Sequence, residues 1–284
     1  MKKLALLLGI VFCSNLFAAA AADDVQAARP TPHPIIWNMG ALNEEALIGL
    51  DVPLIQRKNH LAAPLYVMKD VSALRIMEIR PPLLLEALTY LNSSGFRLLN
   101  LTDLDLSQNR NLSSPLLERI LREISHLAPN LVTLKIQCCG FEDEQAKIIS
   151  QTMPKLTTLD IGWNRLEPVA AESISQMRQL ITLNIQSNYL GANGAEFISK
   201  MGNLRTLYIR ENDIRDRGAS YISQMPHLTT LDIHENDIGY VGVKRIAKMT
   251  WLKTLDVGGY NEIYDRGDGH ALLIQSLPNT AITF

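Results

Sequence analysis

Apolar and polar residues alternate in short blocks that recur along the chain. Each block begins with leucine, has leucine again at its fourth position, and has leucine, isoleucine or valine at its sixth. This period of two predicts a β-strand with one buried face. The starts of the blocks lie 30, 25, 24, 24, 24 and 24 residues apart, at Leu101, Leu131, Leu156, Leu180, Leu204, Leu228 and Leu252.

Several of these blocks are followed by a second pattern, in which apolar residues recur three positions apart. It is found in AESISQM, AEFISKM, ASYISQM and VKRIAKM, which begin at Ala171, Ala195, Ala219 and Val243. That period predicts helices, so the repeating unit is strand, turn and helix. One such unit cannot bury its own apolar face, and we therefore expect neighbouring units to stack around a continuous core of leucines.

The ninth position of each block carries asparagine, with Cys139 in its place in the second copy. The asparagines are Asn109, Asn164, Asn188, Asn212, Asn236 and, one residue later in its block, Asn261. An amide there can donate to and accept from backbone groups that the chain leaves unpaired at the end of the strand. We expect Cys139 to take the same role.

The pattern resembles the leucine-rich repeat, whose signature is L-x-x-L-x-L-x-x-N/C-x-L. The 24-residue length and the segment NYLGANGAEFI from Asn188 resemble the ribonuclease-inhibitor-like subclass and its bacterial relatives. The resemblance covers residues 101–284. It implies an α/β leucine-rich repeat solenoid, with a curved parallel β-sheet on the concave face and helices on the convex face. It also implies a protein-binding module that is not an enzyme.

The N-terminus predicts export, because Lys2 and Lys3 precede an apolar run and then small residues. We assign residues 1–22 to a signal peptide, 23–34 to a linker and 35–73 to an N-terminal cap. Residues 74–284 are assigned to the solenoid, with a degenerate first strand from Leu74 and a closing strand from Leu277. A lipoprotein signal at Cys13 and an uncleaved membrane anchor are the alternatives.

Charge and cysteine content narrow the possible partners. Of 27 basic and 29 acidic residues, two lysines lie in the predicted signal peptide, which leaves 25 against 29 and a net charge of −4. This predicts no nucleic-acid partner, and we expect no stable membrane insertion after signal cleavage. Only Cys138 and Cys139 would remain, which is no disulfide framework. The short leader and the few cysteines favour a bacterial protein in the periplasm or outside the cell.

Strand alternation predicts that the third, fifth and seventh positions face solvent on the concave sheet, with the eighth near the strand end. These positions vary between copies, as expected of the binding face of a repeat protein. Aromatic and charged residues on it are the predicted protein-binding site: Trp163, Tyr208, Arg210, Glu211, Asp232, His234, Glu235 and Asp256. Trp163 packed flat over the rim, and a merely solvated charged face, are the alternatives.

We find no sequence motif for catalysis, a cofactor or a metal ion. A hydrolase using acid–base residues of the concave patch is one alternative function, although a sheet open to water is a poor place to shift pKa values. The tripeptide Arg266-Gly267-Asp268 suggests an adhesin as another. We favour a non-enzymatic binding protein, directed either at a host cell or at components of the bacterium's own envelope.

Overall fold

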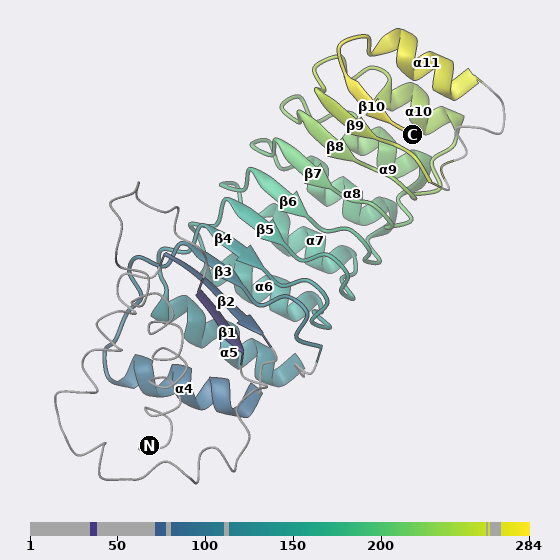
Figure 1. Cartoon of the computed structure of the whole chain (residues 1–284). Coiled ribbons are helices and arrows are strands. Elements are labelled where there is room, and N and C mark those ends of the chain that lie inside the picture. Colours follow the sequence, from purple (N-terminus) through teal and green to yellow (C-terminus); the bar gives the residue numbers. More distant parts are fainter. Residues whose placement is uncertain (1–34, 39–71, 78–80, 111–113, 260, 262–267) are drawn as a thin grey trace, which may run out of the picture. The chain divides into compact units, whose positions relative to one another are not determined.

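The computed structural model describes residues 35–38, 72–77, 81–110, 114–259, 261 and 268–284 (Figure 1). The predicted signal peptide (1–22), the predicted linker (23–34) and residues 39–71 of the predicted cap lie outside these ranges. Within them, none of the helices is both long enough and apolar enough to cross a bilayer. The chain divides into two compact units, one ending at Val132 and the other running from Thr133 to Phe284.

Among the residues that the structure describes, the first unit contains three parallel strands and two helices. Strand β1 (Ile35–Asn38) pairs with β2 (Ala73–Met77), and β2 pairs with β3 (Asp103–Asp105), with Leu74 opposite Leu104. Helix α4 (Pro81–Ser93) follows β2, and α5 (Ser114–Leu127) follows β3. The degenerate strand predicted from Leu74 is therefore β2, and its predicted helix is α4. Strand β1 lies inside the segment that we assigned to the cap.

The second unit is the regular part of the repeat. Its strands are β4 (Thr133–Lys135), β5 (Thr158–Asp160), β6 (Thr182–Asn184), β7 (Thr206–Tyr208), β8 (Thr230–Asp232), β9 (Thr254–Asp256) and β10 (Ala281–Thr283). Each is parallel to the next in chain order, and in β4 to β9 threonine pairs with threonine and leucine with leucine. The block from Leu277 does close the sheet, as β10.

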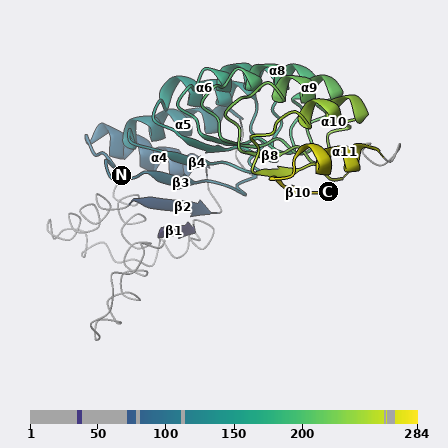
Figure 2. The same cartoon turned by 90° about the horizontal axis from the view of Figure 1, so that it is seen from above.

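Helices alternate with these strands. They are α6 (Asp143–Thr152), α7 (Pro168–Ser175), α8 (Gly191–Ser199), α9 (Arg215–Ile222), α10 (Tyr240–Ile246) and α11 (Asp268–Ser276). In this unit the described helices cover one side of the sheet, and none of them lies on the other side (Figure 2). We call this uncovered side the strand face; it corresponds to the concave face of the sequence prediction. The fold is an α/β leucine-rich repeat solenoid.

The leucines and isoleucines of the blocks form the core of the second unit. The fourth-position leucines of β4 to β9 are at most 1% exposed, and the sixth-position residues are fully buried. Burying a leucine or isoleucine side chain contributes about 1.5–3 kcal/mol each. Because each repeat covers only its neighbours, this contribution depends on the stack and not on any single unit.

The asparagine ladder satisfies the backbone where each strand ends. Asn236 Nδ2 donates to the carbonyls of Ile209, Ile233 and His234 at 3.0–3.1 Å. Its Oδ1 accepts from the N–H groups of Asn212 and Ile214 at 3.0 and 3.4 Å. The other ladder asparagines of the second unit repeat this pattern: Asn164, Asn188, Asn212 and Asn261. The predicted double role of the amide is confirmed.

Cys139 occupies the corresponding place after β4. Its Sγ is fully buried and donates to the carbonyl of Gln137 at 3.2 Å. Its backbone N–H donates to Oδ1 of Asn164 in the next repeat, at 3.0 Å. The cysteine therefore serves as a member of the ladder, as the sequence predicted.

Candidate functional site

The residues of the strand face stay in register beyond the three-residue strands. The N–H at the sixth position donates to the fifth-position carbonyl of the next repeat, as from Ile209 to Asp232 at 2.9 Å. The N–H at the eighth position donates in the same way to the seventh, as from Glu211 to His234 at 3.1 Å. Side chains at the fifth, seventh and eighth positions therefore form rows across neighbouring repeats.

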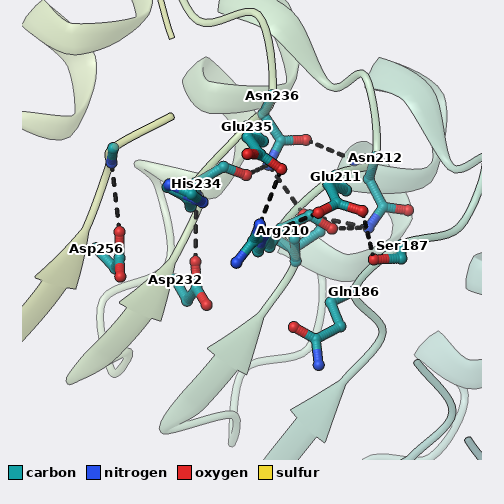
Figure 3. Close-up of polar contacts among 12 residues, drawn as sticks. Gln186, Ser187, Arg210, Glu211, Asn212, Asp232, His234, Glu235, Asn236 and Asp256 are labelled. Atoms are coloured by element: carbon teal, nitrogen blue, oxygen red, sulfur yellow. Dashed lines mark hydrogen bonds and ion pairs between the residues drawn. The ribbon is translucent and has the colours of Figure 1, made fainter. Parts of the chain in front are cut away.

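In five of the seven blocks, the fifth-position side chain accepts a backbone hydrogen bond in the turn that ends the strand. Asp232 Oδ1 accepts the backbone N–H of His234 at 3.1 Å, and Asp256 Oδ1 accepts that of Gly258 at 3.3 Å (Figure 3). Asn184 accepts from Gln186 in the same way, at 3.2 Å. This Asx turn is a common use of a short polar side chain. The sequence prediction missed it, although Asp or Asn recurs at the fifth position of five blocks.

The eighth position turns the chain back toward the helix layer in a left-handed conformation. Its backbone φ lies between 52° and 74° in every repeat, at Gln108, Cys138, Trp163, Ser187, Glu211, Glu235 and Gly259. A side chain there leaves the strand alternation and lies at the rim of the strand face. Left-handed backbone disfavours β-branched residues, and the absence of any at this position is the sequence signal that we overlooked.

Arg210 joins two of the predicted site residues in an ion-pair network. Its Nε lies 3.0 Å from Oε1 of Glu211, and one terminal nitrogen lies 3.0 Å from Oε2 of Glu235 in the next repeat (Figure 3). Ser187 Oγ donates to the other oxygen of Glu211 at 2.8 Å. The hydrogen bond from Ser187 and the charge of Arg210 lower the pKa of Glu211. Although partial burial opposes it, the contacts with Glu235 and Glu211 raise the pKa of Arg210.

Asp232 and Asp256 lie side by side on β8 and β9, because the register pairs them directly. Each uses one oxygen in its Asx turn, and the second oxygen of each has no hydrogen bond or ion pair among the residues that the structure describes. Burial raises the pKa of Asp232, and the neighbouring charge of Asp256 raises it further. The pair is therefore a local excess of negative charge.

His234 is packed more closely than the sequence prediction implied. A Cβ at Gly258 would lie 3.1 Å from Cδ2 of His234, and one at Gly259 would lie 2.9 Å from its Nε2. The imidazole ring therefore packs against both glycines, together with the backbone of Phe284 at Gly258 and the side chain of Glu235 at Gly259. Its Nδ1 is buried and, within the described ranges, makes no hydrogen bond. Asp232 accepts from the backbone of His234 and not from the ring, so these two side chains form no hydrogen-bonded acid–base pair.

The prediction that the seventh position faces solvent is wrong for part of the row. Ser107, Gly162 and Gly258 are buried, because adjacent side chains and backbone cover them. Gly162, for example, leaves a space that Gln186 fills, since a Cβ there would lie 3.0 Å from Cγ of Gln186. A glycine at this position accommodates a large neighbour.

Seven of the eight predicted site residues come together on β7, β8 and β9 and the turns after them. They are Tyr208, Arg210, Glu211, Asp232, His234, Glu235 and Asp256, and we call them the β7–β9 patch. Tyr208 is 36% exposed and pairs in register with Asp232. Trp163 lies apart from the patch, in the turn after β5, and is 47% exposed.

Metal binding and the Arg-Gly-Asp tripeptide are the two other features that the sequence raised. Among the described residues, no group of three or more His, Cys, Asp or Glu is arranged to hold a metal ion. Arg266 and Gly267 of the Arg-Gly-Asp tripeptide lie outside the described ranges, and Asp268 is the first residue of α11.

Comparisons with known proteins agree with the repeat. A family model described as "Leucine Rich repeat" matches residues 152–175, 202–223 and 224–247. The comparison with curated proteins found no match. The chain therefore carries leucine-rich repeats, and the matched segments all lie in the second unit.

Two similar solved structures come from Listeria monocytogenes. The first is an internalin (inlF), with 18% identity, a TM-score of 0.49, and coverage of 68% of this chain and 56% of that chain. The second is an internalin C2 (inlC2), with 17% identity, a TM-score of 0.46, and coverage of 66% of this chain and 69% of that chain. The match spans just over half the length of the first internalin.

Proposed function

We propose that this protein is a non-enzymatic binding module and that a protein partner contacts its strand face. One observation carries the proposal: in the second unit, variable side chains stand on an invariant frame. Threonine and leucine occupy the third and fourth positions of every strand from β4 to β9, while the fifth, seventh and eighth positions each carry several residue types. An extended surface of this kind is how stacked repeats recognise proteins.

Exposed aromatic residues on that surface support the proposal. Trp163 in the turn after β5 and Tyr208 on β7 are both exposed, and aromatic side chains are enriched among the residues that dominate binding energy. The β7–β9 patch supplies charged groups around Tyr208, which favours specificity and fast association over affinity alone.

Export remains part of the same proposal. The Lys-Lys start, the apolar run and the alanines of residues 1–22 support a cleaved signal peptide, followed by a linker (23–34) and a cap (35–73) before the solenoid (74–284). The partner would then be met in the periplasm or outside the cell. Host-cell proteins and envelope proteins of the producing bacterium are the two classes to test.

The test is an affinity capture with the full chain lacking residues 1–22, from host-cell and from bacterial envelope extracts. The doubly substituted variant Trp163→Ala/Tyr208→Ala removes both aromatic anchors. We expect this variant to capture at least about tenfold less partner than the wild type, since interface anchors commonly contribute more than 1 kcal/mol each.

Tyr90→Ala/Val241→Ala is the matched control. Tyr90 on α4 is as exposed as Tyr208, and Val241 on α10 is 60% exposed, but both lie on helices. Capture that survives in the strand-face variant and fails in this control would place the binding surface on the helices and overturn the proposal. Circular dichroism of all variants checks that the fold is unchanged.

A further inference from the structure

The fifth-position row of the β7–β9 patch combines an aromatic ring with two carboxylates. Tyr208, Asp232 and Asp256 pair in register on three adjacent strands. Adjacent strands lie about 4.8 Å apart, so neighbouring side chains of the row are within reach of a single bound group. Because the fourth- and sixth-position side chains are buried in the core, the fifth-position side chains belong to the strand face. None of the described helices of the second unit covers that face (Figure 2).

The charge of this row is not balanced by the protein itself. The patch contains the carboxylates of Glu211, Asp232, Glu235 and Asp256 against one permanent cation, Arg210. That arginine is already held between Glu211 and Glu235, at 3.0 Å from each. In the part of the chain that the structure describes, no lysine or arginine forms an ion pair with Asp232 or Asp256.

Elsewhere the protein does supply a partner for an aspartate at the fifth position. In the first unit, Arg75 on β2 pairs in register with Asp105 on β3, and its Nε lies 3.3 Å from the carboxylate. In the second unit, Asp160 accepts a hydrogen bond from Gln137 and lies opposite the neutral Asn184. The unpaired carboxylates are thus particular to β8 and β9, and not a property of the repeat.

From this difference we infer that the row of Tyr208, Asp232 and Asp256 binds an arginine-containing basic segment of the protein partner. Its guanidinium group lies between the two carboxylates, as that of Arg75 lies beside Asp105, and its flat face covers the ring of Tyr208. A guanidinium group suits this place because it can donate to both carboxylates and stack on an aromatic ring. The inference rests on the proposed function and specifies the chemistry of the partner.

The sheet surface favours a peptide cation over a metal ion. A divalent ion needs several oxygen ligands around it, whereas two carboxylates on a flat sheet offer ligands from one side only. A basic side chain brings its own stem and backbone, which can extend along the row toward Tyr208. The charge of the surface also speeds the approach of a positively charged segment.

The experiment uses fluorescence anisotropy of labelled peptides with the full chain lacking residues 1–22. The probe is a Gly-Ser peptide with several arginines, and its control is the same peptide with citrulline, which has the shape of arginine without the charge. We expect binding of the arginine peptide that weakens as salt is added, and no binding of the citrulline peptide. The variant Asp232→Asn/Asp256→Asn should weaken the arginine peptide at least about tenfold.

The asparagine variant keeps the fold, because Asn184 already forms the same turn at this position. Asp160→Asn/Glu172→Gln removes the same amount of charge from other parts of the second unit and should leave the Kd within about twofold. Tyr208→Ala should weaken binding about threefold to tenfold, and Tyr208→Phe should not, because stacking needs the ring and not the hydroxyl.

Two results would overturn the inference. One is equal affinity of the wild type and Asp232→Asn/Asp256→Asn for the arginine peptide. The other is calorimetric binding of Ca²⁺ alone that is lost in the same variant and that prevents peptide binding, which would make the occupant an ion. If these variants have no effect while Trp163→Ala/Tyr208→Ala still abolishes capture from extracts, the proposed function stands and only the basic partner is rejected.

Discussion

Asp105 in the first unit and Asp232 in the second occupy the same position of the repeat but have different neighbours. Opposite Asp105 the adjacent strand places Arg75, whereas opposite Asp232 it places a second aspartate, Asp256. Both aspartates accept the N–H two residues later, at 2.9 and 3.1 Å, so their backbone role is identical. Asn184 makes the same turn without a charge, and the strands that carry Lys135 or Tyr208 at this position end in the same left-handed conformation, so the turn requires neither the charge nor the oxygen of the fifth position.

This separation of roles explains why the face can vary. Positions that hold the repeat together are buried or bonded to backbone, and they tolerate few residue types. The residue opposite it, at the fifth position of the adjacent strand, can be arginine, asparagine, tyrosine or aspartate, because none of these changes the turn. The charge of the face can therefore change without loss of the fold.

Substitution of Asn236, the ladder asparagine that follows the Asp232 turn, should have the largest effect on stability. Asn236→Ala deletes three donated and two accepted hydrogen bonds and leaves buried backbone groups without partners. The groups that lose their partner are the N–H groups of Asn212 and Ile214, and each costs about 1–3 kcal/mol, so we expect the free energy of unfolding to fall by about 2–6 kcal/mol. Urea denaturation followed by circular dichroism measures it.

The exposed Asn203 provides the matched control for that prediction. It makes one hydrogen bond, to the carbonyl of Arg178 at 2.8 Å. Asn203→Ala should cost less than about 1 kcal/mol. Equal losses in the two variants would mean that the ladder does not support the turns.

Substitution of Arg75, the ion-pair partner of Asp105 in the first unit, should have the next largest effect. Arg75→Ala leaves Asp105 without its ion pair, and because both side chains are partly exposed, the loss of stability should be no more than about 1 kcal/mol. The loss should shrink at high salt, since screening weakens the ion pair in the wild type only. A loss that is unchanged by salt would indicate lost packing of the arginine stem instead.

Much of the fold can be predicted from the sequence, because the same pattern of residues occurs in seven blocks. The positions of Leu231, Ile233 and Asn236 were predictable from period and spacing alone. The site was less predictable, because exposure at the fifth and seventh positions depends on the neighbouring repeat. His234, for example, packs against Gly258 and Gly259, which belong to the next block of the repeat.

Strand alternation also fails at the eighth position, for a backbone reason. Trp163 and Glu235 were predicted near the strand end of the face, and their φ of 52° places them in the turn. The predicted membership of Glu235 in the patch is nevertheless supported by its ion pair with Arg210. Contacts between repeats, and not the order of residues in one repeat, determine which charges meet.

Neutralising one member of the carboxylate pair should have a small effect of opposite sign. Asp256→Asn retains an oxygen for the N–H of Gly258 and removes the repulsion with Asp232. We expect a gain of about 0.5 kcal/mol or less in the free energy of unfolding at neutral pH, since these groups are partly exposed. Asp160→Asn, which weakens the hydrogen bond from Gln137, should give a loss instead.

The smallest effect is a difference in pH dependence between the wild type and Asp232→Asn. Burial and the charge of Asp256 raise the pKa of Asp232 in the folded chain, opposed by the backbone N–H of His234 and by the charges of His234 and Arg210. The folded chain therefore binds this proton more tightly than the unfolded chain, whose aspartates titrate near about 3.9. Stability of the wild type relative to the variant should increase as the pH falls through the raised pKa, and it should become constant below about 3.9.

Urea denaturation of both proteins at a series of pH values gives this difference directly. Groups common to both cancel, including Glu211, whose lowered pKa acts in the opposite direction. A relative stability that decreases as the pH falls would mean that Asp232 is stabilised in its charged form by a cation of the protein. In that case the row on β8 and β9 would have no unbalanced charge with which to attract a basic partner.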